Sequence, residues 1–145
     1  MGLLARDVME TPVLAIDGGV DALGCARSMV QQRKGYAVVL QNGRVGGIVT
    51  EWDFVEKVIA AGLDPSRVRI AEIATPRIQS CAPEAPVDEV VSAMAKGGVR
   101  RMLVLSGDQV VGIITARTVL AQFRRYVDQL SSEIAAGHSD PVTLG

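Results

Sequence analysis

The sequence predicts an α+β protein in which two copies of one β-α-β-β-α unit pack with pseudo-twofold symmetry through their sheets. The first observation is an internal repeat, because residues 44–50 align with residues 109–115 at a constant offset of 65. The second is a pair of short apolar runs in each copy, and the third is a segment of helical pattern on either side of each pair. Self-similarity at a fixed spacing is typical of tandem structural units.

Each copy opens with a short extended segment that follows a Thr-Pro pair, at residues 13–16 and again at 78–81. A helix follows at about 20–33 in the first copy and at about 86–97 in the second. Each predicted helix begins near an acidic side chain, which interacts favourably with a helix N-terminus.

Two strands come next, and in the first copy they are residues 36–40 and 45–49, joined across Asn42-Gly43. Asn-Gly between apolar runs predicts a type I′ hairpin turn, which needs positive φ at both central positions. Residues 106–108 have the same role in the second copy. Because the strands are almost continuously apolar, we expect helices to cover both of their faces. One copy of about 60 residues cannot easily be stable alone, so the two copies should pack sheet against sheet.

A second helix follows each hairpin, at about 51–61 and at about 116–136. The last helix is longer than the repeat needs, and its apolar residues recur at steps of three and four. This stripe could pack on the protein's own core or contact a second copy in a homodimer. The stripe consists of Leu120, Phe123, Val127, Leu130 and Ile134.

The repeats therefore span residues 3–62 and 68–122, and residues 123–137 extend the last helix. Gly137 is a plausible helix end. We expect the tail at 138–145, which holds the single histidine His138, to be disordered.

Composition limits the function. Of the 145 residues, 48% are hydrophobic and 21% charged, which is enough apolar mass for a globular core. The net charge of −1 does not favour binding to nucleic acid or an anionic membrane. There is no signal peptide and no apolar run of membrane-spanning length, so we expect a cytoplasmic protein. Cys25 and Cys81 are far apart and have no zinc-binding spacing, so we expect buried reduced thiols and no metal site.

The hairpin of the first copy ends in the sequence Gly-Ile-Val-Thr-Glu-Trp-Asp at residues 47–53. It resembles the nucleotide signature of cystathionine-β-synthase (CBS) domains, a Gly, two apolar residues, Thr or Ser, two variable residues and Asp. The resemblance covers residues 3 to about 122, and it is specific because both copies place the string between a hairpin and a helix.

The resemblance implies a site for an adenine nucleotide, AMP, ADP or ATP, that includes Gly47 and Ile48. In it, Thr50 and the adjacent backbone N–H groups would point at a phosphate. The carboxylate of Asp53 would accept hydrogen bonds from the ribose hydroxyls. From spacing alone, Thr50 and Asp53 also match a helix capping box, and a ligand could share the same N–H groups.

The second copy departs from the signature, since Thr118 stands where the ribose-binding Asp is expected. We therefore doubt the site around Thr115 and expect one nucleotide site. The resemblance places Arg100, Arg101 and Arg117 opposite Asp53, where a guanidinium could donate to phosphate. These arginines could instead be surface residues paired with nearby acids.

Further candidate contacts come from both copies. Trp52 could shield the ligand or pack against a helix. Gln79 could contact the adenine ring. The full set of these further candidates is Lys34, Tyr36, Glu51, Trp52, Gln79 and Thr115.

The function implied by the resemblance is regulatory: the pair would sense the nucleotide or energy state and modulate a separate partner protein. No nucleophile paired with a base is visible, so we do not expect an enzyme. The alternatives are a ligand-free scaffold for protein interaction or dimerisation, and a binder of S-adenosylmethionine or NAD.

Overall fold

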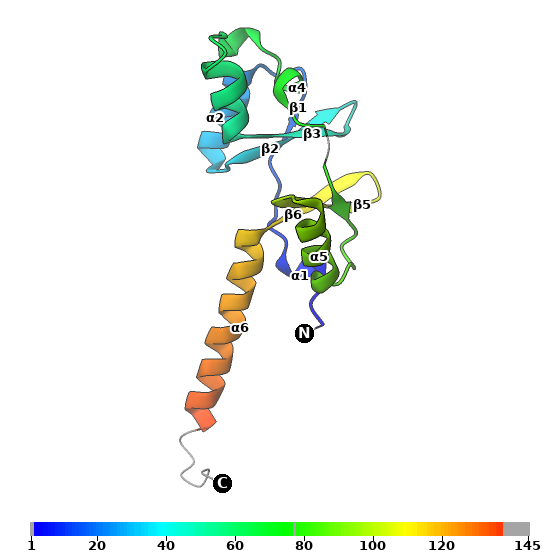
Figure 1. Ribbon diagram of the computed structural model, residues 1–145, viewed down its shortest axis with the longest axis vertical. Helices are drawn as coiled ribbons and strands as arrows, with labels where there is room; N and C mark the ends of the chain where they lie inside the picture. Colours follow the sequence, from blue (N-terminus) through cyan, green and yellow to red (C-terminus); the bar gives the residue numbers. More distant parts are fainter. Residues whose placement is uncertain (1, 77, 138–145) are drawn as a thin grey trace.

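The computed structural model describes residues 2–76 and 78–137. Figure 1 shows two lobes, each with a small sheet and helices, and a long helix that projects from the second lobe. The expectations for His138 and the tail at 138–145 lie outside the described residues.

The first lobe is a three-stranded sheet in the order β1-β2-β3, with β1 parallel to β2 and β2 antiparallel to β3. Its strands are β1 (Ala15–Asp17), β2 (Tyr36–Gln41) and β3 (Arg44–Thr50). Helix α2 (Ala22–Gln32) packs on it. The carboxylate of Asp21 caps this helix by accepting from Gly24 N at 2.7 Å, as the acidic start predicted.

The second lobe repeats this arrangement with strands β4 (Ser80–Cys81), β5 (Arg101–Ser106) and β6 (Gln109–Thr115), and with helix α5 (Val87–Gly97). The strand register is also repeated at the offset of 65. Tyr36 lies opposite Thr50 in the first hairpin, and Arg101 lies opposite Thr115 in the second. Each hairpin carries a β-bulge at the equivalent place. The predicted α+β fold with two repeats is confirmed.

The hairpin turns follow their sequences. Asn42 and Gly43 have φ values of 53° and 75°, the two positive values that a type I′ turn requires. In the second turn Gly107 has a φ of 62°, which a glycine adopts without a steric penalty.

The two sheets pack face to face through a shared apolar cluster. Its buried members come from both lobes and are Tyr36, Val38, Ile48, Leu103 and Ile113. The helices cover only the outer face of each sheet. The expectation of helices on both faces is therefore wrong, because the other repeat's sheet buries the inner face.

The two cores do not follow the repeat boundaries of the sequence. Helix α1 (Ala5–Val8) precedes the first repeat's strands but belongs to the second core, and Ala5 N donates to Ala85 O at 2.7 Å. Helix α4 (Ile70–Ile73) precedes the second repeat's strands but belongs to the first core. Figure 1 shows α1 beside α5, and α4 in the lobe of α2. Each repeat thus lends its first helix to the other.

The helices after the two hairpins differ. In the first repeat α3 (Glu51–Phe54) passes into a π-helical segment, η1 (Val55–Ile59), and a short 3₁₀ turn follows, η2 (Pro65–Arg67). In the second repeat α6 (Ala116–Gly137) is one continuous helix with no buried residue. Packing of the α6 stripe on the protein's own core is therefore wrong.

Candidate functional site

The signature glycine of the first repeat lies against the second repeat. Ile48 N donates to Thr75 O at 3.0 Å, and Thr75 N donates to Ile48 O at 2.8 Å. A Cβ atom on Gly47 would lie 2.8 Å from the Thr75 carbonyl oxygen. Glycine is needed here because the backbone before β4 crosses directly over β3.

The second signature glycine has the equivalent environment in the first repeat. Glu10 N donates to Ile113 O at 2.8 Å, and Ile113 N donates to Glu10 O at 3.1 Å. A Cβ atom on Gly112 would collide with the Met9 side chain. Each signature is thus paired with the segment that precedes the other repeat's first strand. We call the two places the Thr50 site and the Thr115 site.

In the Thr50 site the signature Thr and Asp are joined. Asp53 Oδ2 accepts from Thr50 N at 2.9 Å and from Thr50 Oγ1 at 3.2 Å. The two residues form the predicted capping box at the start of α3. Asp53 is 7% exposed and is the single charged residue of the buried set among the described residues.

The other carboxylate oxygen of Asp53 has a partner that the sequence analysis missed. Lys57 Nζ lies 3.0 Å from Asp53 Oδ1 and donates to the Ile73 carbonyl oxygen at 2.9 Å. An acid followed by a lysine four residues later is a recognisable helix pair, so the spacing could have indicated it. The contact with Ile73, at the end of α4, could not have been predicted from local spacing, because Ile73 is 16 residues from Lys57 in the sequence.

The Thr115 site replaces this carboxylate with a neutral cap. Thr118 Oγ1 accepts from Thr115 N at 2.9 Å and donates to Thr115 O at 2.9 Å. The hydroxyl reproduces the capping role of Asp53 without its charge.

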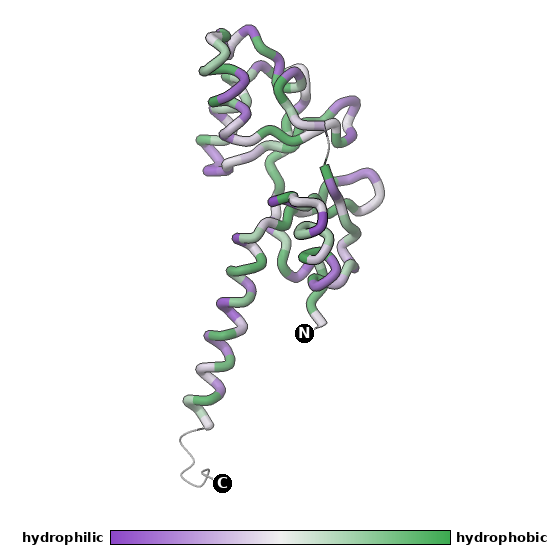
Figure 2. Tube along the Cα trace, in the orientation of Figure 1, coloured by the Kyte–Doolittle hydropathy of each residue, from purple (hydrophilic) through white to green (hydrophobic). Residues whose placement is uncertain are grey.

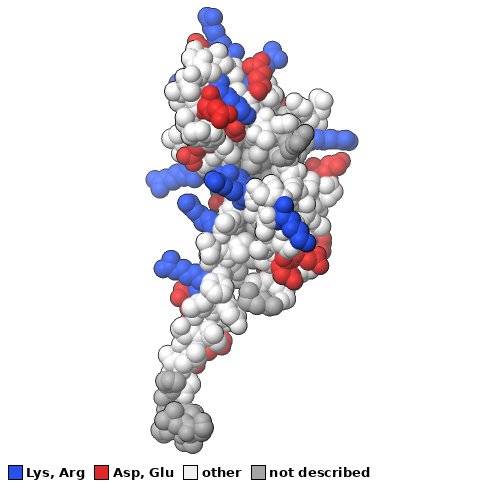
Figure 3. Space-filling view, in the orientation of Figure 1, with Lys and Arg blue, Asp and Glu red and all other residues white. Residues whose placement is uncertain are grey.

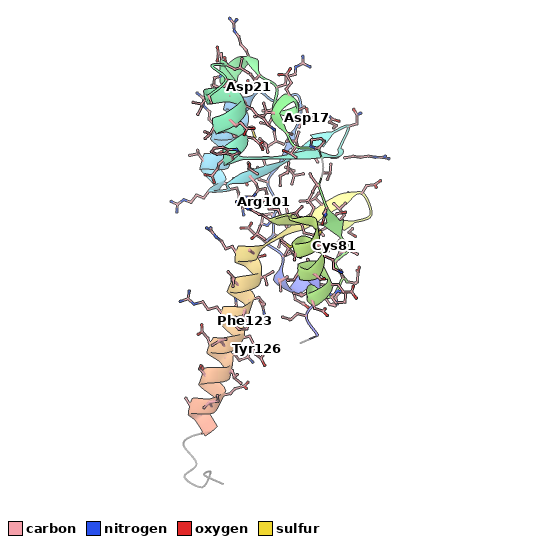
Figure 4. All side chains as sticks on the ribbon, in the orientation of Figure 1. Asp17, Asp21, Cys81, Arg101, Phe123 and Tyr126 are labelled. Atoms are coloured by element: carbon pink, nitrogen blue, oxygen red, sulfur yellow. The ribbon has the colours of Figure 1, made fainter. Side chains whose placement is uncertain are left out.

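Between the two signatures lie two buried polar atoms without partners. Among the described residues, Tyr36 Oη and Arg101 Nε are the buried side-chain polar atoms that make no hydrogen bond. They occupy equivalent positions, at the start of β2 and of β5. Figure 4 shows Arg101 at the junction of the lobes, and Figure 3 shows Lys and Arg side chains gathered near this junction and the start of α6. Unpaired buried donors are costly, so their presence needs an explanation.

The Tyr36 hydroxyl is held in its neutral form. Its pKa is raised to about 12, first by burial and then by the negative charge of Glu10, while the nearby backbone of Leu14 and the positive charge of Arg101 act in the opposite direction. The phenol therefore remains a hydrogen-bond donor at neutral pH.

Lys34 and Glu51, two of the further candidates, lie against other residues of the chain. Lys34 Nζ pairs with Glu10 Oε1 at 3.0 Å, which connects it to the Thr115 site. Glu51 lies against Gly35, and a Cβ atom added to Gly35 would collide with the Glu51 carboxylate. Glu10 was not among the predicted site residues, because a lone acid near a strand start carries no motif.

The other two predicted arginines line two separate hollows of the surface. Arg117 lines a hollow of about 270 Å³ together with Glu10, Thr118 and Arg125, on the side of the Thr115 site. Arg100 lines an apolar groove between α5 and α6. Of the three predicted arginines, Arg101 is the one whose charge acts on the buried Tyr36 hydroxyl.

Trp52 and Gln79 lie on the surface of the chain. Trp52 is 66% exposed and its Nε1 donates to Glu56 Oε2 at 3.0 Å, so it does not pack in the core. The Gln79 amide lies against Gly97 at the end of α5, and Gln79 O accepts from Leu103 N at 3.0 Å.

The thiols and the acidic side chains show no arrangement for a metal in the described part of the chain. Burial raises the pKa of the Cys25 thiol to about 11, and it also raises the pKa of Cys81. Within the described residues, no helix has the length and apolar character needed to cross a bilayer.

The fold and the doubled signature define the class of protein. The CBS domain family model matches residues 5–60 and 70–125, so the chain belongs to the CBS domain family as a tandem pair. It is similar to Hypoxic response protein 1 of Mycobacterium tuberculosis, with 31% identity over 112 residues, 77% of this chain and 78% of the relative. The crystal structure of that protein with two coordinated zinc ions matches with a TM-score of 0.71 at 28% identity, over 82% of this chain and 98% of the other.

Two more distant CBS structures share the fold and contain adenosyl ligands. The CBS domain pair of protein MJ0100, in complex with 5′-methylthioadenosine and S-adenosyl-L-methionine, matches with a TM-score of 0.74 at 23% identity, over 86% of this chain and 98% of the other. PAE2072 from Pyrobaculum aerophilum, complexed with AMP, matches with a TM-score of 0.69 at 19% identity, over 80% of this chain and 89% of the other.

Proposed function

We propose that this CBS pair binds one adenine nucleotide, AMP, ADP or ATP, as a regulatory ligand at the Thr50 site and thereby modulates a separate protein. The observation that carries the proposal is the pair of buried, unpartnered donors, Tyr36 Oη and Arg101 Nε, whose residues lie opposite Thr50 and Thr115 in the two hairpins. A phosphate supplies the acceptor oxygens that both donors lack, and Arg is well suited to bind it.

Asp53 supports the ribose part of the proposal. A carboxylate offers about four acceptor positions, and Thr50 N, Thr50 Oγ1 and Lys57 Nζ use three of those on Asp53. One position is therefore open to a ribose hydroxyl, and a second becomes open when the Thr50 hydroxyl turns to donate to the phosphate. Thr118 offers a hydroxyl that is already used as donor and acceptor within its own turn. We therefore propose one ligand per chain.

The ligands of the two distant relatives support the choice of an adenosine compound. AMP, 5′-methylthioadenosine and S-adenosyl-L-methionine share the adenosine group and differ in what is attached at its 5′ end. The orphaned Arg101 favours an anionic group at that end, which favours a nucleotide over S-adenosylmethionine in this chain. A ligand that binds one arrangement of the two sheets better than another would shift their population, and a partner could detect this shift.

Isothermal titration calorimetry with AMP, ADP, ATP, S-adenosylmethionine and NAD tests the proposal. We expect a nucleotide to bind with one site per chain. Asp53→Ala should abolish binding and reduce the free energy of unfolding by about 0.5–2 kcal/mol through the lost cap. Asp88→Ala, which removes an exposed acid from the first turn of α5, is the matched control and should bind as the wild type does.

If no compound binds to the folded protein, the alternative of a ligand-free scaffold is correct. Unchanged affinity in Asp53→Ala would show that Asp53 is a cap alone. Hydrolysis of a bound nucleotide by the pure protein would contradict a regulatory role and indicate an enzyme.

A further inference from the structure

Helix α6 carries an apolar stripe that belongs to none of the buried core clusters of its own chain. The helix has 22 residues and projects from the second lobe, and its apolar and polar residues alternate along the tube in Figure 2. Figure 4 labels Phe123 on this helix. The side chains of the stripe are 41–65% exposed, and they are Leu120, Phe123, Val127, Leu130 and Ile134.

The spacing of the stripe is that of a coiled coil. The steps from Leu120 to Ile134 are three, four, three and four residues, a period of 3.5. Leu120, Val127 and Ile134 therefore occupy a positions, and Phe123 and Leu130 occupy d positions. β-Branched residues at a with Leu at d favour two parallel strands.

We infer that α6 pairs with α6 of a second copy of this chain as a parallel two-stranded coiled coil. The flanking positions are compatible with this arrangement. A parallel pair places Tyr126 of one helix near Ser131 of the other, and Val119 near Arg124, so no like charges meet. The outer positions have no large apolar side chain and include Arg125, Asp128, Gln129 and Ser132.

The apolar surface open to the second copy extends beyond the stripe. At its N-terminal end the stripe continues into an apolar groove of about 550 Å³ between α5 and α6. Val91, Met94 and Val99 line this groove together with Leu120. Because the CBS match ends at residue 125, the outer half of the pairing helix is a property of this chain and not of the CBS unit.

Sedimentation equilibrium of the full chain tests the pairing. We expect the wild type to be a dimer and Leu130→Asp to be a monomer, because the change buries a charge in the seam. Ser132→Asp adds the same charge to the outer face and should remain a dimer. Leu130 is 43% exposed in the single chain, so circular dichroism should show an intact fold in both variants. A monomeric wild type, or a dimer that persists in Leu130→Asp, would overturn the inference.

Cysteine cross-linking tests the orientation. In a parallel pair, Phe123→Cys and Leu130→Cys should each form a disulfide-linked dimer alone on mild oxidation, with the linked peptides identified by mass spectrometry. Ser132→Cys should not. The absence of a disulfide-linked dimer in both of the first two variants would overturn the parallel arrangement.

Discussion

The Lys57 ammonium lies 3.0 Å from Asp53 Oδ1 and 2.9 Å from the Ile73 carbonyl oxygen. One side chain therefore connects the signature carboxylate of the first repeat to the end of α4. Two residues after Ile73, the backbone of Thr75 bonds to Ile48. Lys57 thus fixes the Asp53 carboxylate relative to the backbone at Thr75, which crosses the signature strand β3.

Lys57→Met keeps the aliphatic stem and removes this connection. The Lys57 side chain is 36% exposed, so we expect the free energy of unfolding to fall by no more than about 1 kcal/mol. Affinity for the nucleotide should fall by roughly tenfold, because Asp53 keeps its cap but loses its fixed orientation. Calorimetric titration and urea unfolding measure the two effects.

The matched control is Lys96→Met, which removes an exposed lysine from the last turn of α5. Lys96→Met should leave both the nucleotide affinity and the free energy of unfolding unchanged. Equal affinity in Lys57→Met and the wild type would mean that Lys57 has a structural role alone.

Tyr36→Phe separates stability from binding. Removing a buried hydroxyl without a partner should raise the free energy of unfolding of the ligand-free protein by about 1 kcal/mol. The same change should weaken nucleotide binding, because Tyr36→Phe lacks the hydroxyl that would donate to the phosphate. A variant that is less stable than the wild type, with unchanged affinity, would contradict the assignment of Tyr36 to the site.

Adjacent glycines of β3 give a second matched pair. Gly47→Ala places a methyl group 2.8 Å from the backbone of Thr75 and should cost about 1–3 kcal/mol of stability by separating the repeats. Gly46→Ala meets the flexible, exposed side chain of Gln41 and should change stability by less than about 1 kcal/mol. Comparable losses in both variants, by thermal unfolding, would show that the crossing at Thr75 is not the constraint.

The buried Cys25 thiol makes the free energy of unfolding depend on pH in the alkaline range. Burial raises its pKa from 9.0 to about 11, so the unfolded chain loses the thiol proton first as the pH rises. The stabilisation is complete below pH 9.0 and is lost between 9.0 and about 11, about 1.4 kcal/mol for each pH unit. Urea unfolding at about pH 8 and about pH 10 should show this loss in the wild type and a smaller one in Cys25→Ala. An equal loss of unfolding free energy between these two pH values in the wild type and in Cys25→Ala would contradict the assignment to Cys25.

Much of the fold could be predicted because its signals are local. The repeat fixed the equivalence of the two hairpins, and Asn42-Gly43 fixed one turn through its positive φ values. The exchange of α1 and α4 could not be predicted, because Ala5 and Ile70 are apolar residues that would suit either core. The π-helical end of the first repeat also has no local signal.

The candidate site was predicted in part for the same reason. The Thr50–Asp53 pair is a contact within one turn, so its spacing indicated it. The surroundings of Arg101 and Arg117 depend on how the lobes meet, so no local pattern indicates them. Arg117 lines a hollow with Glu10 and Thr118, and the assignment of both arginines to the Thr50 site stays a prediction.

The exchange of α1 and α4 has a consequence for how the chain holds together. A fragment that ends after the first repeat would lack the helix that completes its own core and would expose the helix that belongs to its neighbour. Neither half can open, melt or be excised without the other, so the chain unfolds as one cooperative unit. A strain introduced at one signature is therefore carried by covalent connections into the opposite lobe.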